Sequence, residues 1–167
     1  MIYHCCEENR RALVDAHPSL NGIDHLEVLD LDAPLGSPRQ RTLLVRLLKP
    51  VPAGLSPDNL SITGGERIRK VNVEWVGIAS TPPAQASAAE QALLLALDEP
   101  DHVLAVRTDT DGDHSTYSLR LRQAGSLDTP LADFDPRLSA VDFVFKVECP
   151  SDFDCKPQHD CPELVTP

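Results

Sequence analysis

The sequence predicts a mainly β protein: an antiparallel, Ig-like β-sandwich with a short N-terminal helix and an irregular C-terminal tail rich in cysteine and proline. Short apolar or alternating segments recur along the chain, turn residues separate them, and fifteen prolines are unfavourable for long helices. The six or seven candidate strands are residues 23–30, 40–49, 60–63, 71–76, 102–108, 115–122 and 141–147.

A short helix is predicted over residues 6–16, before the first strand. It should end there because His17 precedes Pro18, and the residue before a proline disfavours helical geometry. Asn21-Gly22 is a turn signal and marks the approach to the first strand.

The strand at residues 71–76 alternates cleanly between apolar and polar side chains, and residues 115–122 do the same. Such alternation is typical of a strand with one buried face. Trp75 is the single tryptophan of the chain and is expected in the core.

Residues 82–100 differ in character from the strands. Residues 88–97 combine good helix formers with an aliphatic run, which predicts a short helix or an ordered connection. The whole chain divides into a predicted helical appendage at 1–19, a β-sandwich domain at 20–148, and a cysteine-rich tail or linker to a further domain at 149–167.

The composition limits both the core and the partners. Hydrophobic residues make up 41% of the chain but aromatic residues only 4%, so the core should be built from leucine, valine and isoleucine. A net charge of -11 argues against nucleic acid and anionic membranes as partners, since both attract basic surfaces. No apolar stretch approaches the length of a membrane span, and the opening residues lack the pattern of a signal peptide. We therefore expect assembly in the cytoplasm.

Five cysteines at the two ends of the chain are the main candidate site. Cys149, Cys155 and Cys161 follow one another at a C-x5-C-x5-C spacing, and Cys5 and Cys6 are adjacent near the other end. Both ends flank the β domain, so they could meet on one side of it. Three thiolates from the tail and one from the N-terminus would supply the four ligands of an iron–sulfur cluster, most plausibly 4Fe-4S, or of a structural zinc.

Other fates of the thiols stay open. Disulfides are less favoured, because the cysteine count is odd and a cytoplasmic protein keeps its thiols reduced. Free thiols are a further alternative, and His4 or His159 could replace a missing thiolate. The spacing matches neither zinc ribbons nor bacterial ferredoxins.

Residues 109–113, Asp-Thr-Asp-Gly-Asp, lie between the strands at 102–108 and 115–122 and predict a β-hairpin. They also resemble the start of a calcium loop. A calcium loop of the EF-hand kind needs glycine and glutamate where this chain has His114 and Arg120, so the hairpin is the favoured interpretation.

Catalytic motifs are not evident. Gly64-Gly65 lacks the lysine and serine of a phosphate loop, and the chain has neither G-x-S-x-G nor H-E-x-x-H. The Asp-Phe-Asp triplets at 133–135 and 152–154 pair carboxylates around an aromatic ring, but they are better explained as loops anchored by a buried phenylalanine. We therefore expect no enzymatic activity.

Six segments of the chain have a familiar pattern: MIYHCCEENRRALV, NGIDHLEVLD, QRTLLVRLLKP, SPDNLSITGGERI, GDHSTYSLRL and FDPRLSAVDFVFKVECPSDFDC. The opening and the cysteine-containing end are the most specific parts. Together these segments resemble the N-terminal domain of the baseplate assembly, or wedge, proteins of phage-like contractile injection systems.

The resemblance implies a β-sandwich that belongs to a phage-tail-like particle, assembled in many copies in the bacterial cytoplasm and capable of release. The implied partners are other wedge subunits, the hub and spike proteins and the sheath initiator, without nucleic acid and without membrane insertion. The implied work is baseplate assembly and transmission of the trigger for sheath contraction. Family members continue far beyond the length of this chain, so we expect it to be an N-terminal segment.

Two other functional classes remain open from the sequence. One is an iron–sulfur redox or electron-transfer module that uses the same thiolates. The other is a plain protein- or carbohydrate-binding β-sandwich whose thiols carry no metal.

Overall fold

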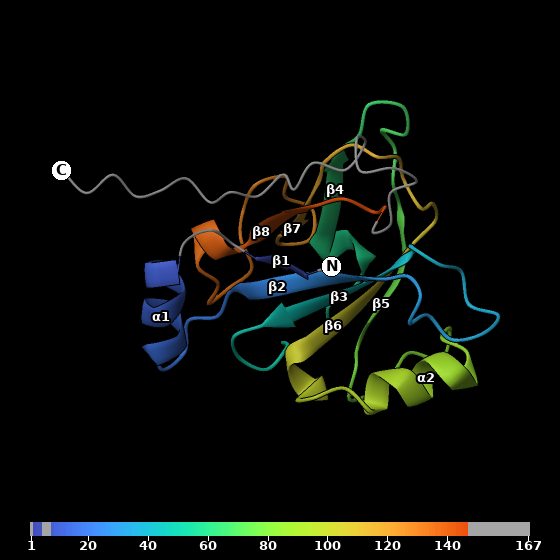
Figure 1. Cartoon of the computed structure of the whole chain (residues 1–167). Coiled ribbons are helices and arrows are strands. Elements are labelled where there is room, and N and C mark those ends of the chain that lie inside the picture. Colours follow the sequence, from blue (N-terminus) through green and yellow to red (C-terminus); the bar gives the residue numbers. More distant parts are fainter. Residues whose placement is uncertain (1, 5–7, 147–167) are drawn as a thin grey trace.

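The computed structural model describes residues 2–4 and 8–146, and in this part of the chain the strands form two antiparallel sheets (Figure 1). The larger sheet has the strand order β1-β2-β3-β6-β5 and the smaller has the order β4-β7-β8. The strands are β1 Ile2–His4, β2 Ile23–Leu29, β3 Thr42–Leu47, β4 Leu60–Gly64, β5 Val73–Ile78, β6 Val103–Thr108, β7 Tyr117–Leu121 and β8 Ala140–Phe143. The prediction of a mainly β fold is confirmed.

Two α-helices and three 3-10 turns complete this part of the chain. The helices are α1 Glu8–Ala16 and α2 Ala88–Leu95, and the turns are η1 Pro57–Asn59, η2 Pro100–His102 and η3 Pro136–Leu138. Neither helix has the length and apolar character needed to cross a lipid bilayer.

The larger sheet is covered on both faces. One face packs against the smaller sheet, and the main core between them includes Leu26, Val45 and Leu119. The other face packs against α2 through a second apolar cluster that includes Trp75 and Leu94. Figure 1 shows α2 on the side of the larger sheet away from the smaller one. The described part of the chain is therefore built in three layers.

This layering explains the sequence pattern of each strand. β6 is buried along its whole length, because it lies inside the larger sheet and is covered on both faces. β7 instead alternates between buried and half-buried residues, since one face of the smaller sheet is open. The predicted burial of Trp75 is confirmed, with 6% of its surface exposed.

Four of the seven aromatic residues gather at one place in the main core. Tyr3 packs edge-on against Phe143, and Phe145 packs edge-on against both Phe143 and Tyr117, with ring centroids 4.9 and 5.0 Å apart. Such edge-to-face pairs add to the free energy of burial. The core is mainly aliphatic, as expected, but this aromatic cluster joins the smaller sheet to β1.

The predicted hairpin between β6 and β7 is wrong. β6 pairs with β3 and β5, whereas β7 pairs with β4 and β8 in the other sheet. Because β6 already has a neighbour on each side, it has no free edge for β7. The Asp-Gly segment instead carries the chain from one sheet to the other.

Other predictions differ in detail. α1 ends at Ala16, as the proline signal predicted, and the helix predicted over 88–97 is α2. The last strand is shorter than predicted, and β1 was not predicted at all because its three residues are too few to show a pattern. The division of the chain at residues 19 and 148 stays a prediction.

A buried asparagine joins the start of β2 to two other segments. The Asn21 side chain accepts hydrogen bonds from the backbone N–H of Gly22 and Lys49, at 2.8 and 2.9 Å, and donates to the carbonyl oxygen of Pro50. Its backbone N–H donates to Asp133 O at 2.7 Å, and its carbonyl oxygen accepts from Asp135 N at 2.9 Å. Asn21 therefore satisfies several buried backbone groups at once.

Replacing Asn21 with alanine should lower the free energy of unfolding by about 3 kcal/mol, because backbone donors at Gly22 and Lys49 would lose their acceptor. Asn72→Ala is the matched control, since Asn72 bonds Asp109 at an exposed position, and it should cost less than about 1 kcal/mol. Urea denaturation measures both changes. Equal losses in the two variants would contradict the role given to Asn21.

Candidate functional site

The predicted cysteine site lies outside the described residues. This holds for Cys5 and Cys6 as well as for Cys149, Cys155 and Cys161. The histidines proposed as substitutes cannot be placed either, because the His4 side chain and all of His159 are outside the description. Among residues 2–4 and 8–146, no three histidine, cysteine, aspartate or glutamate side chains are grouped closely enough to hold a metal ion.

The described segments nearest in sequence to the cysteines do meet. The Tyr3 hydroxyl donates a hydrogen bond of 3.1 Å to the carbonyl oxygen of Val144. Tyr3 lies two residues before Cys5, and Val144 lies five residues before Cys149. These flanking residues are therefore in contact, and the meeting of the cysteine-containing ends stays a prediction.

The aspartate-rich segment at 109–113 uses its carboxylates for internal contacts. Asp113 accepts hydrogen bonds from the backbone N–H of Arg67 and Ile68, at 2.7 and 2.9 Å, and from Ser115. Although burial raises the pKa of Asp113, these hydrogen bonds hold it well below its ordinary value. Asp113 therefore fastens residues 67 and 68 to the loop between the two sheets.

The two neighbouring aspartates are engaged in the same way. Asp109 accepts from the backbone and side-chain N–H groups of Asn72, at 2.9 and 2.7 Å, just before β5. Asp111 accepts from the Lys146 ammonium at 2.5 Å. The three carboxylates thus contact three different segments and are not part of any group of side chains, among the described residues, that could hold a metal ion.

A buried ion pair joins β6 to α2. Arg107 and Glu90 are only 8% and 9% exposed and pair through Nη2 and Oε1. Arg107 also donates from Nε to Thr42 Oγ1 at 3.0 Å, and its guanidinium lies 5.1 Å from the centre of the Trp75 ring. Hydrogen bonding and the aromatic face together compensate the charge of the arginine.

Glu90 also stabilises the first turn of helix α2. Ser87 caps the helix, its hydroxyl accepting from Glu90 N at 3.2 Å, while the Glu90 carboxylate accepts from Ser87 N at 2.7 Å. Burial raises the pKa of Glu90, but hydrogen bonds from Ser87, Ser37 and Arg107 outweigh it and lower the pKa. One carboxylate therefore both forms a capping box and anchors the helix to the sheet.

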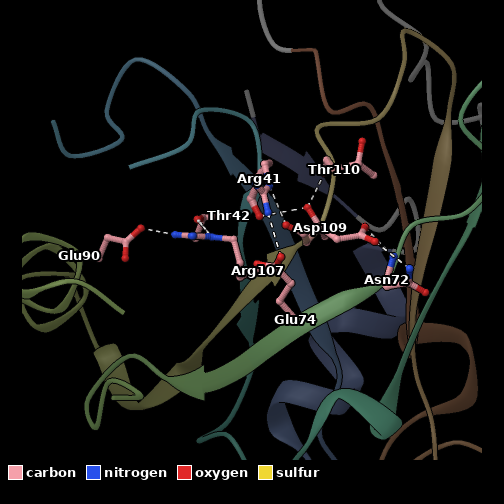
Figure 2. A network of polar contacts seen from close by, with 9 residues as sticks. Arg41, Thr42, Asn72, Glu74, Glu90, Arg107, Asp109 and Thr110 are labelled. Atoms are coloured by element: carbon pink, nitrogen blue, oxygen red, sulfur yellow. Dashed lines mark hydrogen bonds and ion pairs between the residues drawn. The ribbon is translucent and has the colours of Figure 1, made fainter. Parts of the chain in front are cut away.

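A chain of polar contacts continues along the same end of the sheet. Arg41 donates to Thr108 O at 2.8 Å and pairs with Glu74 at 3.1 Å, and Thr108 donates to Thr110 O at 2.7 Å. Figure 2 shows these residues in a row that runs from Glu90 at one end to Asn72 at the other. The row connects α2, β3, β5, β6 and the loop that leads to the smaller sheet.

A small recess lies beside the buried pair. Trp75, Leu94 and Pro34 are among its mainly apolar lining residues, and it has room for about one water molecule. Such a space is far smaller than the pockets that hold cofactors or drug-sized ligands. In chemical terms, the described arrangement is suited to holding secondary-structure elements together.

Sequence reasoning missed the Glu90–Arg107 pair. The available signal was the Ser-x-x-Glu pattern at residues 87–90, which predicts a capping box just ahead of an apolar run. No local pattern, however, indicates that Arg107 of a buried strand faces that glutamate.

Several carboxylates with lowered pKa values predict how stability depends on pH. Asp113, Glu90 and Asp135 release their protons more readily in the folded chain, so the unfolded chain binds more protons as the pH falls. The free energy of unfolding should therefore be steady near neutral pH and decline below about 4.5, the ordinary pKa of glutamate. Denaturant titrations over a pH series measure it.

Asp113→Asn should lower stability at pH 7 and flatten this acid decline. Asp128→Asn, at an exposed position, serves as the control and should leave the curve unchanged. If the Asp113→Asn variant kept the full decline in stability at acid pH, the lowered pKa of Asp113 would not be its cause.

Comparison with known proteins identifies the family. Neither a search of curated proteins nor a search of solved structures gave a match. The family model described as the phage baseplate assembly protein, N-terminal domain, matches residues 1–143. That range ends on the last residue of β8, so it contains all the strands of both described sheets. The chain therefore belongs to the family of phage baseplate assembly protein N-terminal domains.

Proposed function

We propose that this domain is a non-catalytic structural part of the wedge in the baseplate of a contractile injection system. The family match carries the proposal, because it assigns a baseplate structural role to residues 1–143. In this role the domain helps to assemble the baseplate and transmits the trigger for sheath contraction.

The way in which the two helices are attached supports a structural role. α1 is tied to the loop before η3 by the ion pair of Arg10 with buried Asp135 at 2.8 Å. The Lys49 ammonium donates to the carbonyl oxygen of Val14 in α1 and to that of Leu20 after the helix. α2 is tied by the Glu90–Arg107 pair. Both helices are thus fastened to the rest of the domain by charged contacts, which suits a subunit that keeps its shape while neighbours move.

The proposed partners are other wedge subunits, the hub and spike proteins and the sheath initiator. A net charge of -11 favours partners with basic surfaces and opposes binding to nucleic acid. Assembly is proposed to occur in the bacterial cytoplasm, in many copies per particle.

We also propose that the cysteines hold a metal centre, an iron–sulfur cluster or alternatively a structural zinc. The contact between Tyr3 and Val144 supports this, because a chain spans at most about 3.5 Å per residue and only a few residues separate this contact from Cys5 and Cys149. Four thiolates would match the ligand set of either centre. Binding free energy at such a centre would add to the stability of the ends of the domain.

Deleting residues 1–146 from the full-length protein in the producing strain should abolish assembled particles, because the wedge would lose its N-terminal module. Electron microscopy of purified particles measures the yield. Asn72→Ala in the full-length protein is the control and should preserve normal numbers. Particles with complete, contractile baseplates in the deletion strain would refute the structural role.

The Cys149→Ser, Cys155→Ser double variant should lose bound metal. Iron, zinc and acid-labile sulfide are measured on protein purified without oxygen, together with the visible absorption that an iron–sulfur cluster produces and zinc does not. Ser151→Ala is the control within the same segment. Wild-type protein that contains neither metal, or a double variant that keeps its metal, would exclude the proposed centre.

A further inference from the structure

Residues 144–146 follow the last strand, yet each of them is held by another segment of the domain. The Val144 carbonyl oxygen accepts from the Tyr3 hydroxyl of β1 at 3.1 Å. Phe145 is fully buried in the aromatic cluster. The Lys146 ammonium donates to Asp111 at 2.5 Å and to Gln40 Oε1 at 3.1 Å. We call these contacts the C-terminal clasp.

A glycine makes room for the phenylalanine of the clasp. A Cβ atom on Gly112 would lie only 2.3 Å from Cδ2 of the Phe145 ring, and Gly112 has a φ of +59°. The Phe145 ring in turn packs edge-on against Tyr117, with centroids 5.0 Å apart. The loop between the sheets is therefore shaped to the ring that anchors the end of the domain.

The lysine of the clasp, Lys146, is held by two partners, Asp111 and Gln40. Its side chain is only 17% exposed, while that of Asp111 is 50% exposed. Gln40, its second partner, precedes β3 with a φ of +60°, a conformation that is costly for a residue with a side chain. The Gln40 side chain also donates to buried Asp30 at 3.2 Å, which fixes the amide that accepts from Lys146.

Backbone pairing alone holds the end of the domain by few hydrogen bonds. β8 has four residues, lies at the edge of the smaller sheet and, among the described strands, pairs only with β7. An edge strand of this length can separate from its neighbour a few hydrogen bonds at a time. The clasp connects the residues beyond β8 directly to β1, to the start of β3 and to the loop between the sheets.

We propose that the C-terminal clasp is the force-bearing element of this domain, and that it passes tension applied beyond residue 146 into the larger sheet and β1. The proposal rests on the proposed function in a baseplate that transmits a mechanical trigger. Under load the clasp must open before β8 can peel from β7, so it sets the force that the domain withstands.

A pair of glycine variants tests the packing of Phe145 in the clasp. Gly112→Ala should push the Phe145 ring out of its place, because the new methyl group would collide with it. Gly125→Ala is the control: Gly125 also has a positive φ, +79°, but its new methyl group would have no atom within 4 Å. Hydrogen exchange of the full chain reports the amides of residues 143–146. We expect their exchange to increase at least about tenfold in Gly112→Ala and to stay near wild type in Gly125→Ala. Equal effects of the two variants would overturn the packing part.

Single-molecule pulling on the full chain, attached at its two ends, tests the force-bearing role. Lys146→Met should raise the unfolding rate under load about three- to tenfold, because the domain loses a charged contact on the loaded path. Arg46→Met removes the ion pair with Glu99 near the opposite end of β3 from Gln40 and should change the rate under load less than about twofold. Asp111→Asn, which keeps the side-chain size, repeats the test if Lys146→Met folds poorly.

Equal responses of the Lys146 and Arg46 variants, or no response in either clasp variant, would overturn the proposal. The pulling experiment needs no assembled particle. It can therefore fail while particle assembly still depends on the domain, and the two proposals are judged separately.

Discussion

The rest of the structure depends on the packing of Tyr3, Tyr117, Phe143 and Phe145, where the two sheets and the two ends of the described chain meet. The smaller sheet is narrow and one of its faces is open to solvent, so its inner face must be buried against the larger sheet. Large rings fill that junction with few residues. Edge-to-face geometry also orients the rings, which gives the junction a defined shape rather than a loose apolar contact.

On the opposite face of the larger sheet, a charged contact joins α2 to β6. Arg107 lies on a strand that is buried on both sides, and its charge is compensated by Glu90, Thr42 and the Trp75 ring. A buried ion pair is costly to desolvate, so its contribution to the free energy of folding is small, but breaking it from one side is strongly destabilising. The pair therefore fixes where α2 sits more than it adds to stability.

These two junctions fit the role of a baseplate domain. The family match establishes the domain class, and the structure adds how its parts are held: aromatic packing between the sheets, charged contacts to the helices, and the clasp beyond β8. The recess beside α2 has room for about one water molecule.

The sequence by itself determined the mainly β class, most of the strands, both helices and the family. Those features depend on local periodicity, on proline and capping signals and on recognisable segments. Each of these signals involves residues that are close together in the sequence. Burial of Trp75 and Phe134 also followed from local pattern. The cysteine site stays a prediction, because its residues lie outside the described part of the chain.

Only the tertiary structure decided which strands pair and which charges meet. The Asp-Gly signal at residues 111–112 does lie in a connection between two strands, yet this connection leads between sheets, because β6 has both edges occupied and cannot accept β7. Strand β1, the Glu90–Arg107 pair and the clasp at Lys146 likewise join residues far apart in the chain. Such contacts depend on which edges and faces remain free after the rest has packed, and no local pattern of residues carries that information.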